Sequence, residues 1–329
     1  MHTALSDLLG VRHPIVGFNR SPAVVAEVTR AGGFGVLAAT ACTPEELDAQ
    51  LTWIEEQVGG RPYGVDLLVP GKVATGDPQN LIASLRAQIP AEHIAFVENL
   101  MKKYDIPVSE ESSAPYGDDL TSNLGPSGVP ALLDVAFSHR ISLIANALGT
   151  PPPELVERGK AAGEVVASPV GKAEQVRGQL AAEVDMLIAQ GTGAGGHTGT
   201  IATMVLTPEI VDLAGDVPVL AAVGADTLRS PTRTGKPARQ LRSAWHDEWE
   251  RPDGPHPLPM PLQPLLVNDA WTRIDKTVQV GHEGALALET LFIGQVVGGF
   301  QELRSAADIT QDMAADCEQR VKQLSGLLA

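Results

Sequence analysis

Short apolar runs that alternate with segments of helical periodicity are the feature that most constrains the fold of this chain. Seven of these runs are predicted to be strands: residues 14–18, 34–39, 63–70, 141–145, 164–167, 184–190 and 218–222. They are apolar almost throughout, which is typical of a parallel sheet covered by helices. Seven such strands in series favour an α/β fold of the TIM-type (β/α) barrel class over an open doubly wound sheet.

The rest of the chain departs from this repeat. Between the third and fourth strands it is less regular and includes a polar loop at 109–128, which we expect to be an excursion or a lid. Beyond residue 228 it is first basic and rich in turns, then rich in proline, and finally helical. We therefore expect a barrel over residues 1–228 and a Pro-rich and helical extension over residues 229–329 that packs on the barrel.

The chain is acidic, with 24 Lys and Arg against 40 Asp and Glu and a net charge of −16. Such a surface repels phosphate backbones and anionic lipid, which argues against a nucleic-acid partner and against a polybasic membrane anchor. Residues 1–9 contain no basic region and no long apolar stretch. We therefore expect no signal peptide, no transmembrane helix and a location in the cytoplasm.

Residues that could bind a metal are sparse. The two cysteines, Cys42 and Cys317, are far apart in sequence and offer neither a disulfide framework nor a cysteine-rich metal site. The eight histidines do not fall into a ligand spacing such as H-E-x-x-H, so we expect no metal. No G-x-G-x-x-G pattern follows the first strand, which weakens a dinucleotide-binding interpretation.

The most informative stretch is the glycine-rich segment 190–199, which follows the sixth strand. Active sites of barrels lie at this end of the strands. Without side chains, glycines let backbone N–H groups approach a flat or anionic ligand closely. His197, near the end of the segment, could move a proton near neutral pH. The alternative is a flexible glycine-rich loop that carries a solvated histidine.

Residues 189–199 resemble the signature loop of the nitronate monooxygenase family, formerly called 2-nitropropane dioxygenases, which are FMN-dependent TIM-barrel enzymes. Further segments resemble the family in the same order along the chain: 13–16, 31–38, 63–70, 234–239 and 294–298. The resemblance therefore covers nearly the whole chain, and residues 1–228 become the expected FMN-binding part.

The resemblance implies that FMN lies across the carboxyl-terminal mouth of the barrel, where Gln190, Gly195 and Gly196 contact it. His197 matches the family's catalytic histidine. In that role it abstracts the α-proton of a nitroalkane or steadies the nitronate, and oxygen completes the oxidative denitrification to a carbonyl compound and nitrite. The implied partners are thus a nitronate or a related small molecule and oxygen, and a homo-oligomer is left open. A purely structural role of His197 beside the flavin is the alternative.

Asp66 is a first departure from the family, which commonly has Asn at this position. An ionised Asp can accept a hydrogen bond from a flavin ring N–H but cannot donate one, and it disfavours an anionic reduced flavin. We expect Asp66 to contact the cofactor. The alternative is a carboxylate whose hydrogen bonds come from nearby backbone donors.

The second departure is larger. The seventh strand ends at Gly224 and runs directly into residues 225–229, which resemble sequence that belongs after an eighth strand. One barrel repeat, of roughly 30 residues, is missing. Gly224 is then the remaining candidate contact to the FMN phosphate. Loss of the repeat exposes sheet edges and removes anion-binding turns.

Three explanations of the missing repeat compete: a deletion that weakens FMN binding, a gap filled by a neighbouring subunit or by a segment such as 262–267, or a last strand hidden within 225–280. We favour the deletion.

Three functions also compete. They are an FMN-dependent nitronate monooxygenase, which we favour, an enoyl-reductase-like enzyme that reduces FMN with NAD(P)H, and a non-catalytic barrel paralogue that has lost flavin binding.

Overall fold

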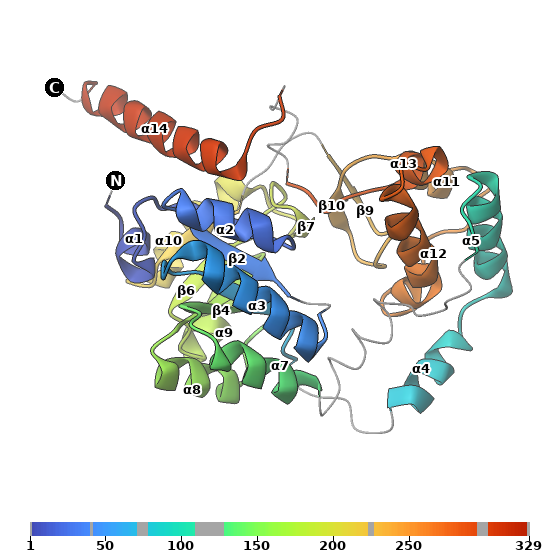
Figure 1. Ribbon diagram of the computed structural model, residues 1–329, viewed down its shortest axis with the longest axis horizontal. Coiled ribbons are helices and arrows are strands. Elements are labelled where there is room, and N and C mark those ends of the chain that lie inside the picture. The colour runs from blue at the N-terminus through green and yellow to red at the C-terminus, as the bar shows by residue number, and fades with distance from the viewer. Residues whose placement is uncertain are drawn as a thin grey trace.

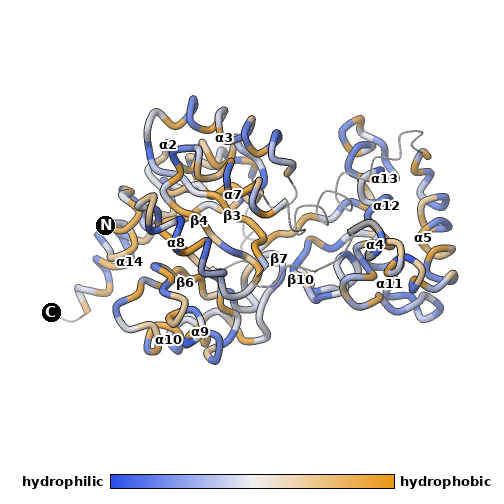
Figure 2. Tube along the Cα trace, turned by 90° about the horizontal axis from the view of Figure 1, so that it is seen from below, coloured by the Kyte–Doolittle hydropathy of each residue, from blue (hydrophilic) through white to orange (hydrophobic). Residues whose placement is uncertain are grey.

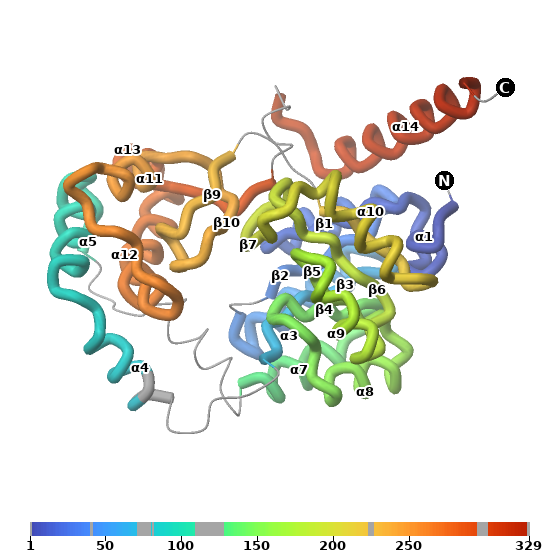
Figure 3. Tube along the Cα trace, turned by 180° about the vertical axis from the view of Figure 1, so that it is seen from behind, coloured from blue at the N-terminus to red at the C-terminus, as the bar shows by residue number. Residues whose placement is uncertain are grey.

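The structure, a computed structural model, describes residues 2–39, 42–70, 78–108, 128–222, 227–294 and 302–327 (Figure 1). These residues form two parts that lie side by side in the views from the front and from behind (Figures 1 and 3). We call the part that contains the parallel sheet and its covering helices the barrel half. We call the other part, built from residues 78–108 and 244–288, the helical lobe.

The strands of the parallel sheet are β1 (Val16–Asn19), β2 (Phe34–Ala38), β3 (Gly64–Leu67), β4 (Leu143–Asn146), β5 (Val165–Val170), β6 (Met186–Ala189) and β8 (Val219–Ala221). They lie in this order, and each neighbouring pair is parallel. Every predicted strand overlaps one of them, so the predicted barrel-type sheet is confirmed. Among the described residues no strand pairs with the outer edge of β1 or of β8. The sheet is therefore open where an eighth strand closes a TIM barrel.

The helices of the barrel half are α1 (Ala4–Leu9), α2 (Pro22–Arg30), α3 (Pro44–Val58), α7 (Gly128–Ser138), α8 (Pro153–Ala162), α9 (Val176–Ala181) and α10 (Thr203–Ala214), with a 3-10 turn, η1 (Ala173–Gln175), before α9. Proline is the first residue of α2, α3 and α8, where its fixed φ suits a helix and its missing N–H is not needed. Thr43 and Glu46 form a capping box at the start of α3.

Two hydrophobic cores lie on the two faces of the parallel sheet. The outer core packs alternate strand residues against the covering helices and includes Val65 and Leu67 of β3. The inner core joins the other strand residues to Leu5 and Leu9 of α1. Because successive strand residues point to opposite faces, Asp66 lies on the inner face. In Figure 2 strands of the sheet stand out as hydrophobic segments inside the barrel half.

The helical lobe contains α4 (Pro78–Arg86), α5 (Ala91–Lys103), α11 (Ala244–Trp249), α12 (Leu262–Val278) and α13 (Glu283–Leu288). Its core takes Val97, Leu100 and Met101 from α5 and three tryptophans from α11 and α12. The ring centroids of Trp245 and Trp271 are 4.7 Å apart. The division of the chain at residue 228 stays a prediction, and the structure adds that this core draws residues from both sides of it.

A small antiparallel sheet connects the two parts. Its strands are β7 (Gly196–His197), β10 (Ala238–Gln240) and β9 (Leu228–Ser230), in that order. The described residues bear on two explanations of the missing repeat, a last strand hidden within 225–280 and a gap filled by 262–267. The strands that follow residue 227 join this separate sheet and not the parallel one, and residues 262–267 form the start of α12 in the helical lobe. Neither fills the open side of the barrel half.

The last helix, α14 (Ala306–Ser325), lies along the outside of the barrel half and contacts α2 (Figure 1). None of the described helices is long and apolar enough to cross a membrane. Residues 109–127 of the predicted excursion or lid, 109–128, lie outside the described residues, and residue 128 begins α7.

Candidate active site

The glycine-rich segment 190–199 leaves the carboxyl end of β6, as predicted, and returns to it. The backbone N–H of Gln190 donates to the carbonyl oxygen of Val170 at 2.8 Å, and the N–H of Gly199 donates to the carbonyl oxygen of Gln190 at 3.0 Å. A third bond, from the N–H of Thr192 to the carbonyl oxygen of Ile201, measures 2.7 Å. The segment is therefore closed at its base by backbone hydrogen bonds.

The glycines of this segment serve two different purposes. A Cβ on Gly191 would lie 2.6 Å from the backbone nitrogen of Thr203, and one on Gly199 would lie 2.2 Å from the carbonyl oxygen of Gly171. Both positions need glycine because other backbone lies against them. Gly196 has a φ of +68°, in the left-handed region, and nothing lies within 4 Å of its Cβ position. Beside Gly196 the segment therefore has free space next to its backbone.

His197 lies directly after Gly196, on β7, and is exposed. Its Nε2 lies 2.9 Å from Oγ1 of Thr234, and its ring centroid lies 6.1 Å from that of Phe292. Desolvation of the ring, followed by the charge of Lys236, lowers the pKa of His197 below its ordinary value. The imidazole is therefore neutral at pH 7, which is the form that accepts a proton.

Two arginines of the small sheet hold the glycine-rich segment. Nε of Arg239 donates to the carbonyl oxygen of Thr192 at 2.6 Å, and Nη2 of Arg229 donates to that of Thr198 at 3.2 Å. Arg239 also donates to the carbonyl oxygen of Thr227 at 2.8 Å. The two arginines are cross-strand partners on β9 and β10. The sequence places Arg239 in a basic cluster that could reach an anionic substrate or the FMN phosphate, or form a solvated or salt-bridged face. It does not show that Arg229 and Arg239 reach back to segment 190–199.

Asp66 is the one charged side chain in a row of register partners that crosses five strands. The row consists of Ala38, Asp66, Ala145, Ala167 and Met186. Asp66 is 3% exposed, and its Oδ2 has no hydrogen-bond partner in the described part of the chain. Burial raises the pKa of this carboxyl well above its ordinary value. A buried polar atom without a partner calls for a missing water, ion or ligand.

The register partners of Asp66 on both neighbouring strands are alanines. The surrounding chain nevertheless covers the carboxyl, since Asp66 is 3% exposed. The expectation that Asp66 cannot donate assumed an ionised carboxylate. With its pKa raised, the neutral acid can donate one hydrogen bond, as an Asn amide can. The predicted contact to the FMN phosphate, Gly224, lies outside the described residues.

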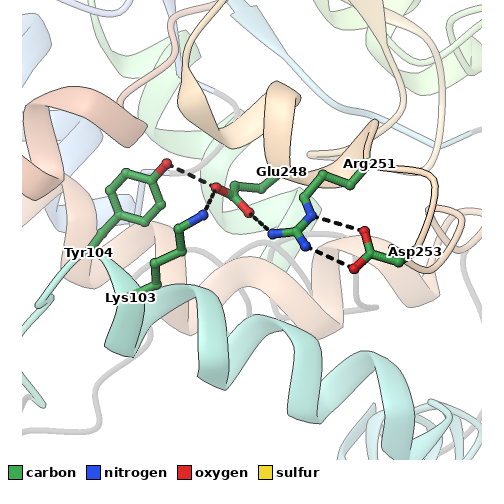
Figure 4. A network of polar contacts seen from close by, with 5 residues as sticks. All are labelled: Lys103, Tyr104, Glu248, Arg251 and Asp253. Carbon is green, nitrogen blue, oxygen red and sulfur yellow. Dashed lines mark hydrogen bonds and ion pairs between the residues drawn. The ribbon is translucent and has the colours of Figure 1, made fainter.

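A separate cavity of about 170 Å³ lies in the helical lobe, away from the glycine-rich segment. Its charged side chains already satisfy one another (Figure 4). Oε1 of Glu248 accepts from Lys103 and from the Tyr104 hydroxyl at 3.1 Å, and Arg251 binds Asp253 through two hydrogen bonds of 2.8 and 3.0 Å. No group of three His, Cys, Asp or Glu residues in the described ranges is arranged to hold a metal ion. The catalytic candidates therefore lie at the carboxyl end of the sheet.

Comparison with known proteins identifies the family. The chain matches the sequence model of nitronate monooxygenase over residues 2–230. A Mycobacterium tuberculosis protein named "Putative monooxygenase Rv1533" is 43% identical over 377 aligned positions that cover all of both chains. The alignment has 377 positions and this chain has 329 residues, so 48 aligned positions have no residue in this chain. That number exceeds one barrel repeat of roughly 30 residues.

A second relative carries a different name. A Rhodococcus jostii protein named (3aS,4S,5R,7aS)-5-hydroxy-7a-methyl-1-oxo-octahydro-1H-indene-4-carboxyl-CoA dehydrogenase is 29% identical over 228 residues. The match covers 68% of this chain and 48% of that protein, so the chain spans about half the length of this relative.

Among solved structures, nitroalkane oxidase from Streptomyces ansochromogenes has a TM-score of 0.68 at 21% identity. The match covers 96% of this chain and 99% of that one. At this identity the likeness concerns the fold, and it agrees with the barrel-type sheet described above. The family match over residues 2–230 contains all seven parallel strands and the glycine-rich segment. The chain therefore belongs to the nitronate monooxygenase family of flavin oxidoreductases.

Proposed function

We propose that this chain is an FMN-dependent nitronate monooxygenase, which converts alkyl nitronates and nitroalkanes with oxygen into a carbonyl compound and nitrite. The observation that carries the proposal is the placement of His197. It stands directly after Gly196, the one position of the glycine-rich segment with a left-handed φ and open space, and its lowered pKa leaves the ring neutral at pH 7.

His197 is the residue that acts on the substrate. The α-carbon of a nitroalkane is acidic because the nitro group takes up the charge that remains after proton loss. A neutral imidazole beside that carbon accepts the proton and leaves the nitronate anion. The imidazolium that forms then lies beside an anion, which stabilises both charges.

Other residues of the chain hold the cofactor. Gln190 at the end of β6 and Gly196, beside open space, are proposed to contact the cofactor. A Cβ on Gly195 would lie 2.9 Å from the backbone nitrogen of Gly294, so at this position only the backbone of Gly195 is proposed to contact it. Gly224 is the proposed contact to the phosphate. The neutral Asp66 replaces the Asn of the family as a hydrogen-bond partner on the inner face. When bound, FMN supplies the electron transfer that links the substrate to oxygen. Arg229 and Arg239 keep segment 190–199 in place through its carbonyl oxygens.

The experiment is to compare wild type with His197→Asn on a neutral nitroalkane and on its nitronate, prepared in advance. Without a base the variant should lose about 100-fold or more in turnover of the neutral nitroalkane, while its flavin content stays unchanged. Nitrite release measures the turnover. Equal turnover of the nitroalkane by both proteins would remove the base role from His197.

A dehydrogenase or reductase is the second candidate, because a relative is named as a carboxyl-CoA dehydrogenase. Oxidation or reduction of a nicotinamide by the flavin-loaded protein, with no nitrite formed from a nitronate, would favour it.

The proposal also includes a cytoplasmic setting.

A further inference from the structure

We propose that Thr234 is a positioning residue that fixes the tautomer of His197, with the proton on Nε2 and the lone pair on Nδ1. Nδ1 is then the atom that receives the proton of the nitroalkane. This inference rests on the proposed function, because it names which atom of His197 carries out the proton transfer.

The hydrogen bonds around the Thr234 hydroxyl carry the argument. Its Oγ1 donates to the carbonyl oxygen of Lys236 at 3.0 Å, and a hydroxyl has one proton to give. The backbone N–H of Lys236 donates back to Oγ1 at 3.4 Å. We assign that proton to the Lys236 carbonyl, so that in the remaining contact of Oγ1, with Nε2 of His197 at 2.9 Å, Thr234 accepts. Nε2 therefore carries the proton, and Nδ1 carries the lone pair.

The two side chains are held together by the backbone. His197 on β7 and Ala238 on β10 are register partners, so the turn that precedes β10 comes back beside the histidine. That turn is closed by two bonds to the carbonyl oxygen of Pro231, from the N–H of Thr234 at 3.2 Å and of Gly235 at 2.7 Å. Gly235 has a φ of +74°, and a Cβ there would lie 2.4 Å from the backbone nitrogen of Met260. The turn is thus fixed against the helical lobe.

The arrangement suits proton abstraction. Among the described residues the hydrogen bond of the His197 ring is made through Nε2, which leaves the lone pair of Nδ1 to take up a proton. The C–H bond of the nitroalkane breaks, its electron pair stays on the nitro compound to give the nitronate, and the proton forms an N–H bond at Nδ1. Throughout the step Nε2–H keeps its bond to Thr234, and that bond strengthens when the ring becomes cationic.

The test uses Thr234→Val and Thr234→Ser in the full chain, with Thr310→Val as the matched control. Thr310 lies on α14 and donates to the carbonyl oxygen of Ala306, so its loss removes a threonine hydroxyl from the outside of the barrel half. Two-bond ¹H–¹⁵N correlation spectra of the His197 ring give the tautomer. Turnover is measured on a neutral nitroalkane and on the preformed nitronate, which needs no base.

We expect wild type, Thr234→Ser and Thr310→Val to show the Nε2–H tautomer and Thr234→Val to show a mixture of tautomers. Thr234→Val should lose about 10-fold in kcat on the neutral nitroalkane and little on the nitronate. A wild-type ring with its proton on Nδ1, or an unchanged ring in Thr234→Val, would overturn the inference. If the spectra behave as expected but wild type releases no nitrite, the tautomer assignment stands and the proposed function fails.

Discussion

The barrel half and the helical lobe are built in different ways. In the barrel half each strand pairs with the strand that precedes it in the sheet order, and the helices between them cover the outer face. The helical lobe instead joins α5 to α11, α12 and α13, which lie more than a hundred residues further along the chain. The first part is a local unit that is repeated, and the second is a long-range assembly around three tryptophans.

The two parts also differ in their buried polar atoms. In the helical lobe the indole nitrogens of Trp245, Trp249 and Trp271 are buried without a hydrogen-bond partner in the described residues, as is Nε2 of His246. Within the strands of the parallel sheet the corresponding atom is Oδ2 of Asp66. Elsewhere in the barrel half, outside these strands, Nδ1 of His13, Oε2 of Glu164 and Oε1 of Gln179 are also buried without a partner in the described residues. The lobe core packs its three tryptophans together, whereas Asp66 places a buried carboxyl on the inner face of the sheet.

The candidate active site takes residues from the barrel half and from the segments that join it to the helical lobe. The parallel sheet places Asp66 and the start of the glycine-rich segment. The segment that links the sheet to the lobe supplies Thr234 and Arg239, and Phe292 lies beside His197 directly after α13. Substitutions that destabilise the helical lobe should therefore displace His197 even when the parallel strands stay folded.

The largest expected effect is on the tryptophan cluster. Trp245→Ala removes a fully buried indole from the lobe core and should lower the free energy of unfolding by about 3–5 kcal/mol. Ile144→Val, which removes one methylene from the outer core of the barrel half, should cost about 0.5–1.5 kcal/mol. Urea denaturation followed by circular dichroism measures both. Similar losses in the two variants would contradict a lobe that depends on its aromatic packing.

The next effect concerns the link between the parts. Arg239→Met leaves the carbonyl oxygens of Thr192 and Thr227 without their charged donor and should cost about 1.5–3 kcal/mol. The control is Arg242→Met, since Arg242 is exposed and pairs with Asp247 and Glu250 at the surface, where a loss of less than about 1 kcal/mol is expected. Thermal unfolding gives both values. Equal losses would show that the Arg239 contacts do not hold the glycine-rich segment.

The third effect is a pH dependence at Asp66. Its folded-state pKa is raised by burial, so its contribution to stability is present below its unfolded-state pKa and is lost as the pH rises through the folded-state pKa. Asp66→Asn is neutral at every pH and avoids this loss. The variant should gain about 1–3 kcal/mol over wild type at pH 8, and the gain should shrink toward pH 4. A difference that does not change with pH would mean that Asp66 is not protonated on folding.

Much of the barrel half can be predicted from the sequence, because strand and helix periods repeat locally. All seven strands and the glycine-rich segment after β6 follow from patterns that are short along the chain, whereas the missing repeat is inferred from the resemblance to the family. The pairing of residues 78–108 with residues 244–288 cannot be predicted in this way, since no local period encodes which distant helix a hydrophobic face will meet. The same reason hides Thr234, Arg239 and Phe292, whose roles depend on contacts made across more than 30 residues.

The Asp66 carboxyl shows a different limit. Its position on a strand, and its departure from the Asn of the family, are visible in the sequence, but its charge state is not. Burial decides that, and burial follows from the inner face of the assembled sheet. The sequence therefore identifies the residue, and the structure shows the burial that raises the pKa of its carboxyl.

The central claim is that a barrel half with seven parallel strands still holds a flavin at its carboxyl end. The most direct measurement is the visible absorbance spectrum of the purified protein before and after addition of excess FMN. The account predicts a bound-flavin spectrum, with FMN released without covalent attachment when the protein is denatured. A folded, colourless protein whose presence leaves the spectrum of added FMN unchanged would contradict it.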